Sequence, residues 1–557
     1  MLPDRPTYDA LIRDFRWEIP ARFNIGAAVS DVWASRDPDR ICLQHFDPTG
    51  EHRALTYQAF AQASSRFAAG LAARGIASGD RVAILLPQGF EAAIAHAGIY
   101  KRGAIALPLA LLFGVEALEF RLRDAGVAAI VTNGFGYEKI SALHARLPEL
   151  RLVVLVDQDG GKDPGTEPFA ALTEGTGEGF RPAETGPDDP ALMIYTSGTT
   201  GPPKGALHGH RVLLGHLPGF QFHHGGLPQP GDRRWTPADW AWAGGLLNAL
   251  LPSLYFGVPV VSSPAQKFDP EMAFRIIETM QVRNAFIPPT ALRLMATVDN
   301  PKARFRFALR SVGAAGEALG RETHEQASAA LGVPINEFYG QTECNIVLSS
   351  GSAWGVLKPG SMGKAAPGHQ VAIIDADGRP LAPGEPGQVA VRRPDPVMFL
   401  GYWKQDAATQ AKFIGDWMTT GDQGVMDEEG YVTFFGRDDD VITSSGYRIG
   451  PSEVEDCLVG HPAVAMAAVV GKPDRLRTEI VKAYVVLAPG FEPGEALSQT
   501  LAAHVKARLS MHEYPREIAF VETLPLTTSG KIIRRLLRDQ ARAEAERAEP
   551  AAPAGPV

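Results

Sequence analysis

Apolar residues recur along the first part of the chain in a pattern typical of alternating helices and strands. Helical spacing predicts a helix over residues 57–74, and a short apolar run predicts a buried strand over 81–86. Continuous apolar strands are typical of sheets buried on both faces, so we expect a parallel sheet covered by helices. The other elements expected here are helices over 90–102, 115–125 and 137–146, and strands over 104–107, 127–132 and 151–156.

A second block repeats this alternation. Residues 157–188, rich in Gly, Pro, Asp and Glu, are expected to form an exposed connector between the blocks. The second block is predicted to contain helices over 239–251, 270–281, 289–297 and 320–331, and strands over 258–262, 284–287, 310–314 and 334–338.

The last third of the chain has a different pattern of apolar segments and turn residues. Residues 360–435 contain short apolar segments between Asp-Gly, Pro-Gly and Glu-Gly turns, which predict an antiparallel sheet or a small barrel. After Arg437 a smaller α+β module is expected, in which Ser452 and Glu455 form a capping box that opens a helix. Its other predicted elements are strands over 463–470, 480–487 and 517–522 and a helix over 496–509. From Ala541 the composition of Ala, Glu and Pro predicts disorder.

These patterns predict an α/β fold with several domains, which agrees with a length of 557 residues. We expect a large N-terminal domain (1–437) of two doubly wound α/β subdomains plus a small β-barrel. A smaller α+β C-terminal domain (438–540) and a disordered tail (541–557) follow it.

Composition narrows the class of protein. Hydrophobic residues make up 45% and charged residues 21%, which is ordinary for a globular protein, and the net charge of −9 argues against a nucleic-acid partner. Three scattered cysteines and the lack of a signal-peptide pattern after Met1 lead us to expect a reducing, cytoplasmic setting. The uncharged run over 240–266 is long enough for a membrane span, but its Asn248, Pro252 and Pro259 favour a buried core, so no span is expected.

The strongest chemical signal is the loop Tyr195-Thr196-Ser197-Gly198-Thr199-Thr200-Gly201-Pro202-Pro203-Lys204-Gly205. Hydroxyl residues and glycines leave backbone N–H groups free to surround an anion, and the lysine adds a positive charge. A Walker A loop is disfavoured, because Pro203 and Gly205 occupy positions that need Gly and Ser or Thr. A phosphate-binding loop is therefore predicted, with a plain polar turn as the alternative.

Other motifs suit a nucleotide. The segment Tyr339-Gly340-Gln341-Thr342-Glu343 follows a predicted strand end, where open α/β sheets bind ligands. Glu343 suits magnesium, although, for this residue taken alone, a glutamate that complements a helix dipole is the simpler explanation. The small residues of Gly313-Ala314-Ala315-Gly316-Glu317-Ala318 let a purine approach the backbone. Asp422 and Arg437, from Thr420-Gly421-Asp422 and Gly436-Arg437-Asp438-Asp439-Asp440, suit a ribose, although each alone is a common turn or surface residue.

Together with Ser444-Ser445-Gly446-Tyr447-Arg448-Ile449 and Pro525-Leu526-Thr527-Thr528-Ser529-Gly530-Lys531, these motifs stand in an order that resembles the adenylate-forming superfamily. Over roughly residues 30–540 the chain looks like an acyl-CoA synthetase similar to the medium-chain branch. The resemblance implies ATP, Mg²⁺ and coenzyme A as cofactors, and a small carboxylic acid as substrate. It also implies a C-terminal lid that rotates between adenylation of the acid and transfer of the acyl group to CoA.

The resemblance assigns roles to individual residues. Lys531 is implied as the lid lysine of adenylation, Asp439 as the hinge, Glu343 as the magnesium ligand, and Asp422 with Arg437 as the ribose contacts. Gly446 is implied to line the pantetheine tunnel, and Arg448 belongs to the cofactor-binding set. The phosphate set is Thr196, Ser197, Gly198, Thr199, Thr200 and Lys204; the adenine set is Gly316, Glu317, Ala318, Asn336, Glu337, Phe338 and Tyr339, extended by Gly340, Gln341 and Thr342.

The acyl pocket is expected, by family position, along Trp240, Trp242, Ala243 and Gly244, with Gly340 at its floor. Acetate-specific relatives carry Trp where this sequence has Gly340, which predicts a deeper pocket here and a substitution Gly340→Trp that shortens the accepted chain. Small uncharged residues favour a short- to medium-chain, branched or cyclic acid, with an aryl acid such as a benzoate as the alternative.

Two other functions share these motifs. A stand-alone adenylation enzyme that loads a carrier protein remains open if Asp239 is buried and able to pair with a substrate amine, and a luciferase-like oxygenase would use the same adenylation residues. A monomer or homodimer is expected.

Overall fold

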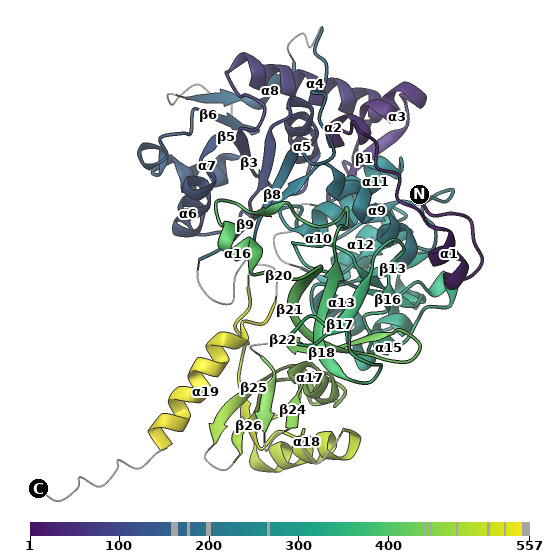
Figure 1. Ribbon diagram of the computed structural model, residues 1–557, viewed down its shortest axis with the longest axis vertical. Coiled ribbons are helices and arrows are strands. Elements are labelled where there is room, and N and C mark those ends of the chain that lie inside the picture. Colours follow the sequence, from purple (N-terminus) through teal and green to yellow (C-terminus); the bar gives the residue numbers. More distant parts are fainter. Residues whose placement is uncertain are drawn as a thin grey trace, which may run out of the picture.

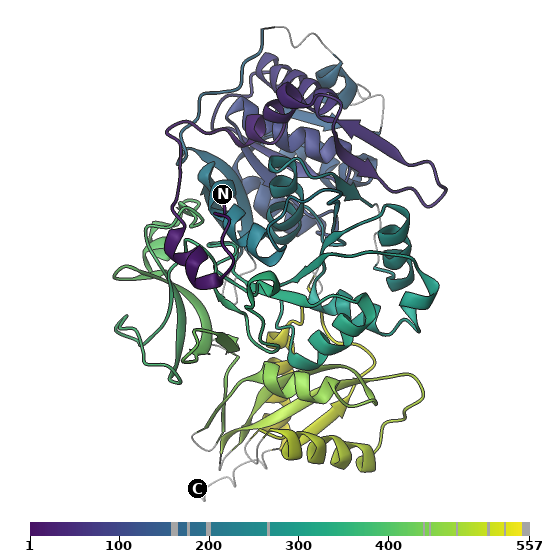
Figure 2. The same cartoon turned by 90° about the vertical axis from the view of Figure 1, so that its right-hand side faces the viewer.

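The computed structural model describes residues 1–157, 165–174, 179–196, 202–263, 268–437, 440–444, 447–474, 477–509, 513–527 and 531–548. The chain forms a large body with a small domain beneath it (Figures 1 and 2). Among the described residues, no helix has both the length and the apolar character needed to cross a membrane.

Two mixed sheets with parallel centres form most of the large body. The first has the strand order β19 (Gly401–Tyr402), β9 (Lys204–Gly209), β8 (Pro190–Thr196), β4 (Ile105–Pro108), β3 (Arg81–Leu85), β5 (Val127–Thr132), β6 (Leu152–Leu155), β7 (Thr166–Pro168). The second has the order β16 (Lys364–Ala365), β15 (Leu348–Ser349), β14 (Ile335–Tyr339), β13 (Ser311–Ala314), β12 (Asn284–Phe286), β10 (Arg234–Trp235), β11 (Val260–Ser262), β1 (Ile41–His45), β2 (Arg53–Thr56).

Helices fill the space between these sheets and cover their outer faces. Val82 and Ile84 of β3 belong to the central core cluster, whereas Ala83 and Leu85 belong to an outer one, as the two-residue period of a strand requires. The central layer contains α4 (Tyr57–Ala73), α5 (Phe90–Arg102) and α9 (Arg211–His223); α6 (Val115–Ala125) and α7 (Gly134–Ser141) cover the first sheet, and α12 (Pro270–Thr279), α13 (Pro289–Ala296) and α15 (Arg321–Leu331) cover the second.

Shorter helices complete the large domain. They are α1 (Tyr8–Asp14), α2 (Ile25–Ala28), α3 (Asp31–Arg36), α8 (Phe169–Thr173), α10 (Ala243–Gly245), α11 (Leu251–Tyr255), α14 (Pro301–Arg304) and α16 (Asp406–Gln410), with 3₁₀ turns at His144–Arg146 and Ser352–Trp354 and a π-helical turn at Leu246–Leu250.

The turn-rich region forms an antiparallel sheet, which confirms the first of the two alternatives. Its strands are β17 (Val371–Ile374), β18 (Pro386–Arg392), β21 (Trp417–Met426), β20 (Phe413–Ile414) and β22 (Val432–Arg437). The expected small barrel is wrong for the described strands, because their pairings form an open path in which β21 contacts β18, β20 and β22.

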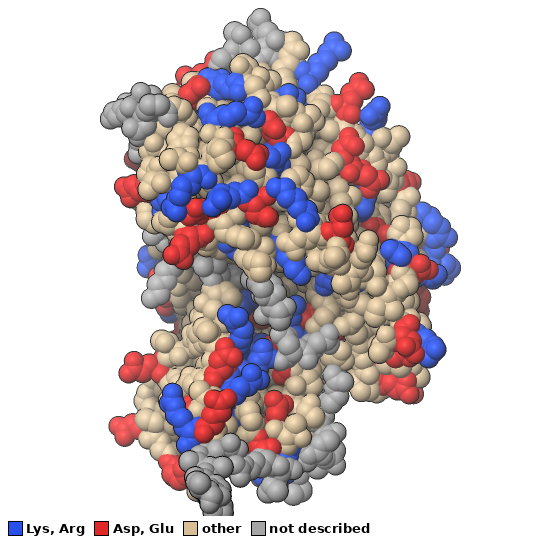
Figure 3. Space-filling view, turned by 60° about the vertical axis from the view of Figure 1, so that its left-hand side comes forward, with Lys and Arg blue, Asp and Glu red and all other residues tan. Residues whose placement is uncertain are grey.

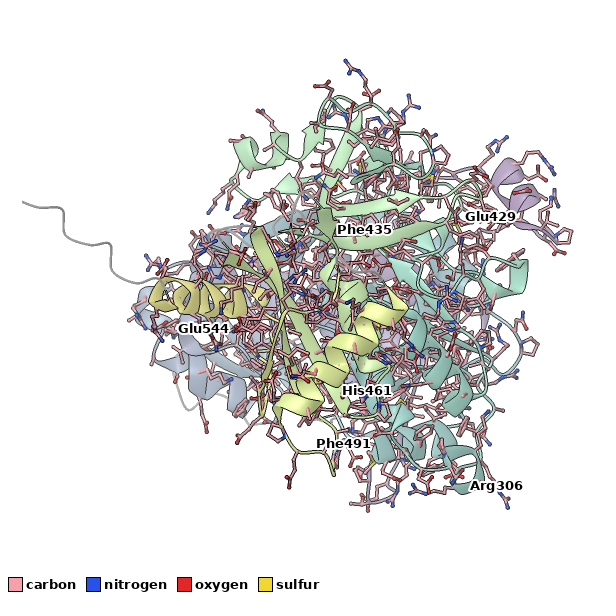
Figure 4. The ribbon with its side chains drawn as sticks, turned by 90° about the horizontal axis from the view of Figure 1, so that it is seen from below. Arg306, Glu429, Phe435, His461, Phe491 and Glu544 are labelled. Carbon is pink, nitrogen blue, oxygen red and sulfur yellow. The ribbon has the colours of Figure 1, made fainter. Side chains whose placement is uncertain are left out.

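The C-terminal domain is a sheet between helices on opposite faces. The sheet contains β24 (Tyr447–Ile449), β23 (Ile442–Ser444), β26 (Thr478–Leu487), β25 (Val464–Asp474) and β27 (Glu517–Phe520). One face packs on α17 (Pro451–Val459) and α18 (Glu495–Arg508), and the other on α19 (Arg534–Ala548). Figure 4 shows this separation, with Glu544 of α19 well apart from His461 and Phe491 near α18.

Several expected elements differ from the observed ones. The single helix over 239–251 is replaced by α10, a π-helical turn and α11. The connector over 157–188 contains β7 and α8, whose Phe169 and Leu172 are buried. The tail is helical as far as Ala548, because Leu537 and Ala541 of α19 pack against the sheet; residues 549–557 lie outside the described residues.

The predicted capping box is also wrong. Gly450 is the N-cap residue of α17, and Pro451 occupies the first helical turn, so Ser452 lies inside the helix. Glu455 accepts hydrogen bonds from the amide of Val469 at 2.8 Å and from Arg534 at 2.6 Å. A Ser-x-x-Glu spacing indicates a cap only where the serine precedes the helix.

Candidate functional site

A hydrogen-bonded cluster around Asp422 joins the end of β14 to the β21–β22 hairpin. The Tyr339 hydroxyl and the Gln341 amide donate to Asp422 Oδ2 at 2.5 and 3.0 Å, and Arg437 Nε lies 3.4 Å from Oδ1. Burial raises the pKa of Asp422, while Arg437, Tyr339 and Gln341 oppose that rise. The cluster offers a carboxylate acceptor next to a guanidinium, groups that suit the hydroxyls of a sugar.

Lys531 lies beside the small-residue loop of the second sheet. Its amide donates to Thr527 Oγ1 at 3.0 Å, and its carbonyl accepts from the Thr527 amide at 2.7 Å, so a narrow clip holds it. Its Cε lies 3.9 Å from the point where a Cβ on Gly316 would stand, and Gly316 has the positive φ of 101° that favours glycine. The predicted lid lysine and the predicted adenine loop are therefore neighbours.

The electrostatic surroundings of Lys531 come mainly from the large domain. Enclosure by protein lowers the pKa of this lysine and Arg437 lowers it further, whereas Glu317 and Asp422 raise it. The side chain nevertheless keeps solvent-accessible surface. Figure 3 shows that lysines, arginines and carboxylates are interspersed on the face that it displays.

Strand β14 divides the predicted adenine residues between its two sides. Asn336 donates to the carbonyl of His223 at 2.8 Å, and the ring of Phe338 stacks on His223 with centroids 4.4 Å apart, so both side chains face α9. Glu337 instead accepts from the Leu319 amide at 3.1 Å, and burial raises its pKa to about 8. Only Glu337 and Tyr339 of this strand direct their side chains toward the 316–319 loop or the Asp422 cluster.

Glu317 is fixed by the neighbouring helix α13. Thr290 Oγ1 lies 2.9 and 2.8 Å from its two carboxylate oxygens, and Arg293 NH1 lies 3.5 Å from one of them. Arg293 NH2 also donates to the carbonyl of Ala318 at 3.3 Å. Contacts from α13 therefore hold Glu317 and Ala318 in the loop that Lys531 approaches.

A third group of residues gathers at Tyr402. The Tyr402 hydroxyl donates to Oε1 of the buried Glu343 at 2.5 Å, and Lys204 Nζ lies 5.1 Å from the Tyr402 ring centroid. Thr196 Oγ1 lies 3.4 Å from the Lys204 carbonyl oxygen. The predicted phosphate lysine and the predicted metal ligand therefore share one tyrosine, while Ser197, Gly198, Thr199 and Thr200 lie outside the described residues.

Tyr402 had no sequence signal of its own. It belongs to β19, a strand Gly401–Tyr402 that pairs with β9, in which Tyr402 stands opposite Ala206. The partner strand is almost 200 residues earlier in the chain, so only the folded sheet brings Tyr402 to the phosphate loop.

The predicted acyl-pocket residues separate in the structure. Trp240 is 2% exposed and belongs to the central core cluster, whereas Trp242 is half-buried with its ring centroid 5.6 Å from that of Phe113. Ala243 packs on the same core as Trp240. A Cβ on Gly244 would stand 3.0 Å from the edge of the Phe286 ring.

The expected role of Gly340 as an open pocket floor is wrong. A Cβ at this position would stand 1.1 Å from the carbonyl oxygen of Asn345, because the turn over 341–345 folds back onto Gly340. Any side chain there would displace the backbone, so the shortening of the accepted chain predicted for Gly340→Trp does not follow.

Asp239 forms a local turn. Its Oδ1 accepts from the amide of Ala241 at 3.0 Å, and burial raises its pKa to about 6. The side chain is half-buried, and one of its oxygens is committed to the turn that leads into α10.

Asp439 and Gly446 lie outside the described residues, and of Arg448 only the backbone is described, paired with Thr443 in the β23–β24 hairpin.

Two family models match the chain. That of the AMP-binding enzyme matches residues 30–403, and that of the AMP-binding enzyme C-terminal domain matches residues 453–531. Acyl-coenzyme A synthetase ACSM2 of Rattus norvegicus is 35% identical over 94% of this chain and 92% of its own length.

Solved structures agree with these matches. The acyl-CoA synthetase of Brucella canis is 36% identical, with a TM-score of 0.75 over 98% of this chain and 100% of its own. The anthranilate CoA ligase AuaEII, solved with anthranoyl-AMP, is 28% identical, with a TM-score of 0.86 over 95% of this chain and 99% of its own.

Proposed function

Because the chain belongs to the AMP-binding enzyme family and is an AMP-forming acyl-CoA ligase, we propose that it activates a short- to medium-chain, branched or cyclic carboxylic acid. In the first step the acid carboxylate attacks the α-phosphate of ATP, forming an acyl-adenylate and releasing pyrophosphate. In the second step the CoA thiol displaces AMP from the acyl carbonyl, giving the acyl thioester.

The observation that carries the adenylation step is the position of Lys531 next to Gly316. A carboxylate and a triphosphate repel each other, so a cation between them stabilises the charge that develops at phosphorus. Asp422 and Arg437 suit the ribose, and both influence the pKa of Lys531, which supports a lysine close to the same nucleotide. The lid carries this lysine, so turning the lid would remove it and admit CoA. Asp439 as the hinge of that movement, with Gly446 and Arg448 on the CoA side, stays a prediction.

A magnesium ion fits the site beside Glu343, Tyr402 and Lys204. The ion usually takes one or two carboxylates and completes its shell with phosphate oxygens and water, so a single buried glutamate near Lys204 suffices. Tyr402 would orient that carboxylate through its hydroxyl. The ion would neutralise the phosphates when bound.

The acid class rests on the surroundings of Gly244 and Gly313. Phe286 lies against Gly244, and Phe338 and His223 lie 3.0 and 2.8 Å from the place of a Cβ on Gly313. These aromatic rings lie next to the 313–318 loop and favour an apolar acid over a dianionic one.

An aryl acid is the second candidate for the same reason, since flat rings stack well on aromatic side chains. The likeness to an anthranilate CoA ligase supports this alternative. Amine recognition by Asp239 is disfavoured, because the Ala241 amide already holds one of its oxygens.

A pyrophosphate-release assay over a panel of acids, with and without CoA, tests the proposal. The panel should include straight-chain, branched, cyclic, benzoic, amino and dicarboxylic acids at equal concentration. We expect apolar acids to give pyrophosphate without CoA and thioester only with CoA. Preference for a dicarboxylic or an amino acid would contradict it.

A further inference from the structure

Helix α15 begins just after a glycine, so its N-cap residue supplies no capping side chain. The residue before it, Gly320, has no side chain and a φ of 73°, and no side-chain cap from that position closes the helix. The first amides of a helix have no partner within the helix, so they need an acceptor from elsewhere. Helix α15 follows the 316–319 loop, the part of the large domain that Lys531 approaches.

The acceptor comes from the C-terminal domain. Asp456 of α17 accepts from the Arg321 amide through Oδ2 at 3.0 Å. Its Oδ1 lies 1.9 Å from the point where a Cβ on Gly320 would stand, so the carboxylate occupies the space that a side chain at 320 would need. Burial raises the pKa of Asp456, while the amides of Arg321 and Glu322 lower it. Figure 1 shows α17 next to α15 at this junction.

A second contact between the two domains is weaker. Arg508 of α18 lies 3.9 Å from Glu322, and about half of the arginine side chain is exposed. An exposed ion pair at that distance contributes little, because solvent screens it. Asp456 is therefore the better-placed polar anchor at this end of α15.

The anchor and Lys531 approach the same short segment. Gly316 and Arg321 are five residues apart (321 − 316), and the Leu319 amide between them is held by Glu337. Asp456 and Lys531 move together, because Arg534 next to the Lys531 clip pairs with Glu455 at 2.6 Å, the residue before Asp456. Seating the carboxylate on α15 and seating the lysine at Gly316 are thus parts of one domain orientation.

We propose that Asp456 is a positioning residue for adenylation: it caps α15 from the lid and stabilises the orientation that brings Lys531 to the nucleotide. The inference rests on the proposed two-position lid but not on the identity of the acid. When the lid turns for thioester formation, the α15 amides lose this acceptor, and Gly320 leaves the space open to water. The cap therefore shifts the balance between the two positions toward adenylation.

The test compares Asp456→Ala and Asp456→Asn with Glu453→Ala, which removes an exposed carboxylate from the same helix. Two rates are measured for each protein: pyrophosphate release from acid plus ATP, and thioester formation from supplied acyl-adenylate plus CoA. Losing an N-cap acceptor corresponds to roughly a threefold to thirtyfold change in an equilibrium. We expect Asp456→Ala to lower the ratio of the first rate to the second by about tenfold, Asp456→Asn to lower it less, and Glu453→Ala to leave it unchanged.

Amide hydrogen exchange at residues 321–322 is the second measurement, and it needs no acid. Asp456→Ala should speed exchange at these large-domain amides in the presence of ATP, although the substitution is in the other domain. Unchanged exchange, or an equal fall of both rates, would overturn the proposal. Failure of the proposed function is distinct: Lys531→Ala would then affect both steps alike, while the exchange result would still report whether Asp456 caps α15.

Discussion

The Asp422 cluster and the Lys531 clip differ in how each is held in place. Asp422 is fixed within the large domain by Tyr339, Gln341 and Arg437, which come from β14, the residues after it, and β22. Lys531 belongs to a different domain and reaches the same region only through the way the lid is seated. One part of the site is built by folding within the large domain, and we propose that the other is supplied by a domain orientation that changes between the two steps. Substitutions in the two parts should therefore affect the two half-reactions differently.

Removing the charge of Lys531, which the C-terminal domain brings to the site, should give the largest effect. Lys531→Ala should lower pyrophosphate release by on the order of 10² to 10³, because it removes a charge from the transition state of that step. Thioester formation from supplied acyl-adenylate should stay within about tenfold of wild type. Arg535→Ala, in an exposed residue of the same basic segment, is the matched control and should change neither rate. An equal fall in both steps would contradict a lysine that acts only in adenylation.

Substituting Asp422, which is held within the large domain, should give a smaller effect on both steps. Asp422→Asn removes a charge but keeps an acceptor, and charged hydrogen bonds contribute about 1.5–3 kcal/mol, so affinity for ATP and for acyl-adenylate should fall roughly tenfold to a hundredfold. Asp427→Asn is the control, since Asp427 pairs with Lys358 on the surface. Titration of both ligands measures the result, and a loss confined to one of them would contradict a shared ribose contact.

Short motifs predicted the groups but not the contacts between them. The alternation of apolar runs predicted the two sheets, because buried parallel strands are nearly continuous in Val, Ile, Leu and Ala. Asp422 and Arg437 were recognised from their local motifs, and the structure places them opposite each other in the β21–β22 pairing. Pairs such as Tyr402 with Glu343 and Asp456 with Arg321 have no local pattern, because each joins elements that only tertiary folding brings together. The prediction that Gly340 forms an open pocket floor was wrong for the same reason. The carbonyl of Asn345 fills the direction that a side chain at 340 would take, and no local motif indicates that contact.

The last prediction concerns stability and no catalytic step, and its subject is the buried Glu337, which accepts a hydrogen bond from the Leu319 amide. Burial raises its pKa to about 8, and nearby Asp456 adds to that rise, against a value of 4.5 for the free group. The folded protein therefore keeps this proton at pH values where the unfolded chain has lost it. Its contribution to stability is complete below about pH 4.5 and is lost as pH rises through about 8. Between these values the free energy of unfolding should fall by up to about 1.4 kcal/mol per pH unit on account of this one group.

The variant Glu337→Gln tests this prediction, because it keeps an oxygen acceptor for the Leu319 amide and cannot ionise. Its free energy of unfolding, measured with denaturant from pH 5 to 9, should depend less steeply on pH than that of wild type. Glu325→Gln, on the exposed side of α15, should leave the slope unchanged. Identical slopes for Glu337→Gln and wild type would mean that Glu337 is already ionised in the folded protein, and the 316–319 loop would then be held by a charged carboxylate instead of a neutral one.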